Sequence, residues 1–260
     1  MNFEKNADIY NWKQFRKKVR NKGTKLLSQL DKFPNAILVT GCQRSGTTLI
    51  TRLIAECNGI KHFWISKDDE LDAALVLSGY INIFEPGRFC FQTTYLNENY
   101  KEYYDHDIEY KLVWVIRHPY SVIYSMVYNW KRFALNELFW KCAMSNHKNI
   151  EYTFSNNLKV KPIIKAALAY NAKLRQLIEL YDHFHFNNSL IVIDYDELVS
   201  NSQEILGYMS TKLQLEDLQS KYISIHNNSI KKFDKLNISD KLIISEICVP
   251  LYSEIKYLIS

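Results

Sequence analysis

A loop framed by two glycines is the segment of this sequence best suited to chemistry. Gly41 and Gly46 stand five residues apart, and residues 36–40 before them form an apolar run. This is the spacing of the phosphate-binding loop G-x-x-x-x-G-K-[ST], in which backbone N–H groups at a helix start hold phosphate oxygens. Thr47 occupies the position of the lysine, however, and a cation, Arg44, lies inside the loop instead. We therefore predict a loop that binds an anionic ester but is not built like an ATPase loop.

The side chains of the loop favour the same kind of ligand. Arg44 is a permanently charged bidentate donor, and several hydroxyl groups follow it in the sequence. A strand–helix turn without a ligand is the alternative, but it does not explain why glycines, hydroxyls and an internal arginine coincide. The predicted binding residues of the loop are Gly41, Gln43, Arg44, Ser45, Gly46, Thr47 and Thr48.

A second basic position follows another apolar strand. Residues 111–116 are almost entirely apolar, Arg117 comes directly after them, and Pro119 is suited to the first turn of a helix. Ser125 lies eight residues after Arg117, about two turns into that helix. Because α/β sheets bind ligands at the carboxyl ends of their strands, Arg117 is well placed to meet a ligand, and Ser125 can donate a hydroxyl. Taken alone, however, the pair is better explained as a structural arginine at a strand end and a serine buried in a helix.

Together, the two segments resemble the two nucleotide-binding signatures of the sulfotransferases that use 3′-phosphoadenosine 5′-phosphosulfate (PAPS). The resemblance implies that the glycine-framed loop holds the 5′-phosphosulfate, that Arg117 and Ser125 hold the 3′-phosphate, and that 3′,5′-ADP (PAP) is the product. Residues 190–199 are similar to a later strand and turn of the family, which implies that Tyr195 lies near the nucleotide; a structural tyrosine is the alternative. Lys231 and Lys232 are weakly similar to a basic segment near the phosphosulfate. The family requires no metal.

Transfer of a sulfonate to a hydroxyl also needs a group that accepts the proton. When residues 91–95 are aligned with the Lys-Thr-His strand of the aryl-type enzymes, Gln92 takes the place of the lysine and Thr94 that of the histidine. This departure argues against a histidine base. Other branches place a glutamate beyond the loop cation, and Glu70 follows Arg44 by 26 residues. The predicted catalytic residues are Glu70 as base and Arg44 as the group that stabilises the leaving oxygen.

Two other acidic residues stay open as the base. Asp69 belongs to the same acidic run, and Glu85 resembles an element of other carbohydrate branches. For the whole run, a solvated face or a helix start is the structural alternative.

Apolar strands that alternate with amphipathic helices predict a layered α/β domain with a central, mostly parallel sheet flanked by helices. The resemblance makes this a P-loop NTPase-like sulfotransferase fold. We predict one domain over residues 1–260, with residues 1–30 as a basic N-terminal segment that is helical over 9–30. A less regular stretch, with one strand near 89–95, is expected between about 60 and 110. Further strands are expected at 36–40, 111–116 and 190–193, and helices after the loop, from Pro119, from Pro162, at 202–213 and at 239–258.

Composition excludes several other classes. The chain has 260 residues, of which 47% are hydrophobic and 23% charged, as in soluble globular proteins. A net charge of +5 favours anionic ligands but is too mild for a dedicated nucleic-acid binder. The five cysteines form no C-x-x-C pair, so neither a zinc site nor a disulfide framework is predicted. We expect no membrane span and a cytoplasmic location.

Two other functions are compatible with this sequence. In a P-loop kinase or NTPase, residues 191–194 would be the strand that holds Mg²⁺, although the missing lysine argues against it. A non-catalytic protein that binds 3′-phosphoadenosine nucleotides is the second rival. The acceptor stays open among small-molecule, carbohydrate and peptide hydroxyls, with an amine also considered, and so does the oligomeric state.

Overall fold

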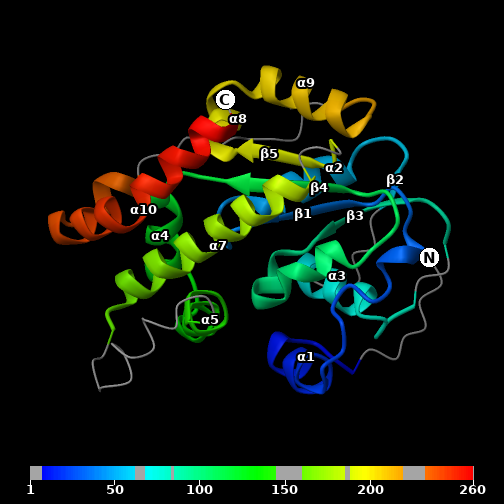
Figure 1. Ribbon diagram of the computed structural model, residues 1–260, viewed down its shortest axis with the longest axis horizontal. Helices are drawn as coiled ribbons and strands as arrows, with labels where there is room; N and C mark the ends of the chain where they lie inside the picture. Colours follow the sequence, from blue (N-terminus) through cyan, green and yellow to red (C-terminus); the bar gives the residue numbers. More distant parts are fainter. Residues whose placement is uncertain are drawn as a thin grey trace. The chain divides into compact units, whose positions relative to one another are not determined.

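The computed structural model describes residues 8–61, 68–82, 85–144, 160–184, 188–218 and 232–259. Its strands form an all-parallel sheet with the order β2-β3-β1-β4-β5 (Figure 1). This confirms the predicted α/β class with a parallel sheet and surrounding helices. The strands are β1 (Ile37–Gly41), β2 (Ile60–Lys61), β3 (Arg88–Gln92), β4 (Lys111–Ile116) and β5 (Leu190–Asp194).

The strand order reverses beside β1, which has β3 on one side and β4 on the other. Open parallel sheets bind ligands at such a switch point, outside the carboxyl ends of the strands. The helices among the described residues are α1 (Trp12–Lys18), α2 (Thr47–Ala55), α3 (Asp69–Leu77), α4 (Pro119–Tyr128), α5 (Arg132–Leu138), α7 (Pro162–Phe184), α8 (Tyr195–Ser200), α9 (Ser202–Leu213) and α10 (Ile238–Ile259). Shorter 3₁₀ and π-helical turns lie at Arg20–Lys22, Leu30–Lys32, Thr94–Tyr104 and Phe139–Met144.

The chain divides into two compact units, which are described separately here. Unit 1 comprises Met1–Thr40, Thr47–Val113 and Leu206–Gln219, and unit 2 comprises Gly41–Gly46, Trp114–Ile205 and Ser220–Ser260. The prediction of a single domain remains a prediction.

In unit 1, β3 pairs in parallel with both β1 and β2. Every residue of β1 is buried, as expected for an apolar strand covered on both faces. The register sets Val39 of β1 opposite Gln92, the last residue of β3. Helices α2 and α3 both pack on β3. The start of α2 and the end of β3 are thus held within one packed group.

In unit 2, the long helices α4, α7 and α10 pack against one another (Figure 1). Pro162 starts α7, as predicted, since its missing N–H costs nothing in a first helical turn. Four alanines of α7 are fully buried, and small side chains allow neighbouring helices to approach closely: Ala166, Ala167, Ala169 and Ala172.

Three of the predicted elements differ in extent from the structure. The helix predicted over 9–30 ends at Lys18 and continues only as short turns. Like charges at i and i+4, such as Arg16 and Arg20, destabilise a longer helix here. The strand expected near 89–95 ends at Gln92. The stretch expected to be irregular contains α3, whose N-cap Asp68 accepts a hydrogen bond from the N–H of Leu71.

No helix among the described residues is both long enough and apolar enough to cross a membrane.

Candidate active site

The loop between β1 and α2 is shaped by two close approaches of its glycines. A Cβ on Gly41 would overlap the carbonyl oxygen of Val115 in β4. At Gly46, φ is +107°, and a Cβ there would overlap the ring of Tyr195. Any other residue would push the loop away from these neighbours. The glycines that define the sequence motif are therefore required by the packing of unit 2.

Ser45 anchors the loop to β4 from the inside. It is fully buried, and its hydroxyl lies 2.6 Å from the carbonyl oxygen of Cys42 and 3.1 Å from that of Val115. The hydroxyl predicted to donate to a ligand is thus occupied by backbone carbonyls. Arg44, by contrast, is exposed and has a positive φ of 73°. This backbone conformation costs a non-glycine residue free energy and is typical of functional turns.

The side chain of Arg44 reaches the predicted second motif. Its Nε donates to the hydroxyl of Ser125 in α4 at 3.0 Å, and that serine is buried. Partial burial and the positive charge of Arg117 lower the pKa of Arg44. Arg117 itself is buried at the end of β4, with 4% of its surface exposed. The two sequence motifs, which lie far apart along the chain, thus meet within unit 2.

A third cation belongs to the same group. Burial, followed by the charges of Arg117 and Arg44, lowers the pKa of Lys232 to about 8. Lys231, its predicted neighbour, lies outside the described residues. Burial also lowers the pKa of His118, so its ring adds no positive charge at neutral pH. Three cations that repel one another are electrostatically suited to a multiply charged anion. We call Arg44, Arg117 and Lys232, together with Ser125, the cation cluster.

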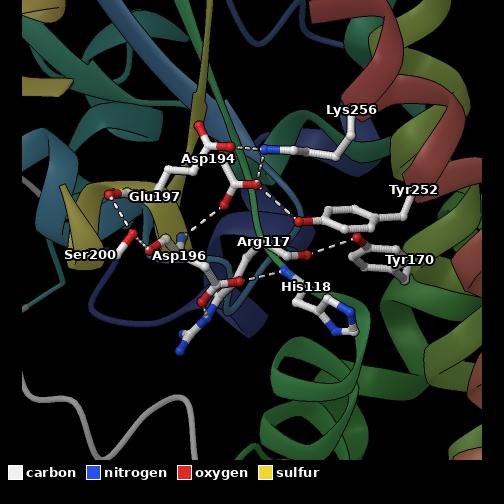
Figure 2. A network of polar contacts seen from close by, with 9 residues as sticks. All are labelled: Arg117, His118, Tyr170, Asp194, Asp196, Glu197, Ser200, Tyr252 and Lys256. Atoms are coloured by element: carbon white, nitrogen blue, oxygen red, sulfur yellow. Dashed lines mark hydrogen bonds and ion pairs between the residues drawn. The ribbon is translucent and has the colours of Figure 1, made fainter. Parts of the chain in front are cut away.

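The guanidinium of Arg117 contacts the side chains of Tyr195 and Asp196, the second of which is drawn in Figure 2. Its guanidinium stacks on the ring of Tyr195 with 4.3 Å from Cζ to the ring centre. Its Nε faces Oδ1 of Asp196 at 3.5 Å. Like Nε, its Nη2 is buried and finds no hydrogen-bond acceptor among the described residues. A buried charged donor without an acceptor is costly, so this atom points to a ligand.

A different group of side chains surrounds Glu70 in unit 1. The hydroxyl of Thr94 donates to its Oε1, and Nε2 of Gln92 lies 3.5 Å from its Oε2. The same Nε2 lies 3.2 Å from Oγ1 of Thr47, the residue that directly follows Gly46. Gln92 and Thr94 are buried, whereas Glu70 remains partly exposed. We call Glu70, Gln92, Thr94 and Thr47 the carboxylate cluster.

The other two candidate bases are engaged elsewhere in unit 1. Asp69 is 7% exposed, and its Oδ2 accepts from Nε of Arg52 at 2.8 Å. Oε2 of Glu85 lies 3.5 Å from Nζ of Lys61, and both side chains are partly buried. Neither shares the buried hydroxyl and amide donors that surround Glu70.

The structure therefore brings Arg44, Arg117 and Ser125 together in one cluster, and Glu70 and Thr47 in the other. Thr48 lies exposed in the first turn of α2, while Gln43 is half-buried inside the loop. Sequence reasoning placed Gln92 and Thr94 at the positions of a missing lysine and histidine but did not make them partners of Glu70. It missed Asp196 altogether, although an acidic residue directly after Tyr195 was visible in the sequence.

A parallel α/β sheet whose first strand runs through a glycine-framed loop into a helix defines a P-loop-like protein. No protein-family model matches this sequence, and no curated protein matches it. Among solved structures, the sulfotransferase domain from the curacin biosynthetic pathway is similar with a TM-score of 0.53 and 12% identity, over 82% of this chain and 97% of that one. The sulfotransferase domain of the Synechococcus PCC 7002 olefin synthase gives 0.52 and 14%, over 82% and 94%. The chain has the fold of sulfotransferase domains.

Proposed function

We propose that this protein is a sulfotransferase that moves the sulfonate of PAPS to a hydroxyl or amine acceptor. The observation that carries the proposal is the cation cluster, above all the buried Nη2 of Arg117 that finds no acceptor among the described residues. The sulfotransferase fold supports it.

The cation cluster fits the two charged ends of PAPS. Arg117 and Ser125 would hold the 3′-phosphate, which carries about −1.5 to −2 charges by analogy with phosphorylated side chains. Lys232 would lie near the phosphosulfate. Arg44, the backbone of the loop and the start of α2 would hold the 5′-phosphosulfate. Tyr195, already stacked on Arg117, would lie beside the nucleotide. Ser45 would serve this site by fixing the loop, because its hydroxyl is bonded to backbone carbonyls.

Bound PAPS supplies a sulfonate whose bond to the phosphate oxygen breaks as the acceptor oxygen or nitrogen attacks the sulfur. Glu70 would take the proton that the acceptor loses. Arg44 would stabilise the negative charge left on the phosphate oxygen of the departing PAP. Thr94 and Gln92 would keep the carboxylate of Glu70 in one orientation. Through its contact with Gln92, Thr47 joins the carboxylate cluster to the start of α2.

The rival kinase function is disfavoured by Asp194. The P-loop kinase reading needs this residue as a ligand of Mg²⁺. Its Oδ1 accepts from the N–H of Asp196 at 2.8 Å. Its Oδ2 lies 2.9 Å from both Oη of Tyr252 and Nζ of Lys256. A carboxylate with both oxygens engaged by protein donors is a poor magnesium ligand.

Ligand-induced stabilisation separates these functions. PAP without Mg²⁺ should raise the melting temperature of the protein, whereas ATP with Mg²⁺ should not. Labelled PAPS offered with pools of phenols, sugars, amines and tyrosine peptides should then yield a sulfonated product. Stabilisation by ATP with Mg²⁺ but not by PAP would refute the proposal. PAP binding without transfer to any pool would favour the non-catalytic alternative.

A further inference from the structure

The acidic residues after β5 form a connected network around Arg117 (Figure 2). Asp194 ends β5 and accepts from Tyr252 and Lys256 of the C-terminal helix α10. Its other oxygen caps the backbone N–H of Asp196 at the start of α8. Through Asp194, the network therefore ties the start of α8, where Asp196 lies, to α10.

Asp196 in turn contacts the end of β4 with both carboxylate oxygens. Its Oδ2 accepts from the N–H of His118 at 2.8 Å, and its Oδ1 faces Nε of Arg117 at 3.5 Å. The carbonyl oxygen of Arg117 accepts from the hydroxyl of Tyr170 at 2.8 Å. The backbone of Arg117 is thus held. Asp196 lies beside Nε without a hydrogen bond to it, and the neighbouring Nη2 finds no acceptor among the described residues and is left to meet a ligand.

We propose that Asp196 is a positioning residue that makes the site selective for a nucleotide with a 3′-phosphate. It would act through Arg117, whose guanidinium it orients so that Nη2 faces the 3′-phosphate. This inference rests on the proposed function, because it assumes that the 3′-phosphate of PAPS or PAP binds at Arg117. It assigns a role to a residue that would not itself touch the nucleotide.

If Asp196 acted only through its negative charge, removing its carboxylate should strengthen the binding of nucleotides. A negative charge beside the cation cluster weakens the attraction for any anion, so its loss should strengthen binding of every nucleotide. If Asp196 orients Arg117, its loss should weaken binding of nucleotides that carry a 3′-phosphate and leave the others unchanged. The sign of the change separates orientation from general charge.

The test compares the affinities of PAP and 5′-AMP, which lacks the 3′-phosphate, by calorimetry on the full chain. The wild type should prefer PAP. Asp196→Asn should lower the affinity for PAP about tenfold, the scale of one charge-assisted hydrogen bond. It should leave the affinity for 5′-AMP unchanged. In an Arg117→Ala background, the same change should have no further effect, because the pair acts as a unit.

Glu204→Gln is the matched control, since it removes one exposed negative charge from α9. It should leave both affinities unchanged. If the asparagine variant does not fold, Asp196→Ser is a second variant that removes the charge beside Arg117. An unchanged ratio of the two affinities, or an equal gain for both nucleotides, would overturn the inference alone. A wild type that does not prefer PAP would overturn the proposed function as well.

Discussion

The cation cluster and the carboxylate cluster are built in opposite ways. The first sets three positive side chains near one another and leaves a buried guanidinium nitrogen without an acceptor among the described residues. The second surrounds one carboxylate with neutral donors from Gln92 and Thr94. The first arrangement is unfavourable until an anion binds, whereas in the second the carboxylate of Glu70 already has neutral donors beside it. Within the proposed function, this difference assigns PAPS binding to the cation cluster and proton transfer to the carboxylate cluster.

The sharpest test of this division is the loss of the carboxylate. Glu70→Gln should lower turnover about 10²–10⁴-fold, the usual contribution of a general base. The affinity for PAP should not change, because Gln keeps the shape of the side chain and the cation cluster is untouched. Single-turnover transfer of labelled sulfonate measures the first quantity, and calorimetry with PAP measures the second.

Glu85→Gln is the matched control for this change, since Glu85 is the partly buried alternative that pairs with Lys61. It should retain full turnover. Retained turnover in Glu70→Gln together with a loss in Glu85→Gln would move the base to the other residue.

The corresponding change in the cation cluster should affect binding first. Arg44→Ala removes the donor that reaches Ser125 and should weaken PAP about 10–100-fold, as expected for a lost charged partner. Arg175→Ala, an exposed position on α7, controls for the loss of one positive charge. Equal losses of PAP affinity in both variants would show that only net charge matters, and would break the comparison.

The two clusters also differ in how far the sequence predicts them. The cation cluster rests on short motifs at strand ends, and apolar strands buried on both faces are easy to recognise. The bounds of β1, β4 and β5 accordingly fall within one residue of their predicted ranges. Arg44, Arg117 and Ser125 could therefore be named before the fold was seen.

The carboxylate cluster depends on tertiary neighbours instead. Gln92 meets Thr47 because β3 lies beside β1, a pairing that no local pattern encodes. Helix α3 was missed because nearly all of its residues are buried, so it has no polar face to give a helical period. The role of Asp196 could not be predicted from the sequence either, because it follows from the packing of α8 against the end of β4.

A pH dependence should distinguish the cation cluster further. The pKa of Lys232 is lowered to about 8, so the free protein loses this charge as the pH rises through that value. Because a bound phosphate favours the charged form, the affinity for PAP should fall about tenfold between pH 7 and pH 9. Calorimetry across this range measures the change.

Two variants of Lys232 serve as controls for that profile. Lys232→Arg keeps its charge throughout and should bind PAP equally well at both pH values. Lys232→Met carries no charge at this position at any pH, so its affinity for PAP should be low and should not change between the two pH values. A flat profile in the wild type would remove Lys232 from the cluster.

The smallest expected effect is at Gln92, whose amide contacts both Glu70 and Thr47, the first residue of α2. Gln92 has two amide protons for three acceptors, at 3.2 Å for Thr47 and 3.5 Å for both Glu70 and Thr94. It therefore cannot satisfy all three at once. If its main role is to orient Glu70, Gln92→Leu should lower kcat about threefold to tenfold, the scale of one neutral hydrogen bond, and leave the affinity for PAP unchanged. Thr94→Val should lower kcat more, because its hydroxyl makes the closer contact with the carboxylate.

The outcome for Gln92 decides whether the two clusters act separately. If Gln92→Leu weakened PAP while kcat at saturating PAPS stayed the same, Gln92 would act through Thr47 and support the donor loop. The carboxylate cluster would then be an extension of the loop, joined to it at the first residue of α2, rather than a separate device for moving the proton. A loss confined to kcat would keep the two roles apart, as the neutral donors around Glu70 and the cations around Arg117 predict.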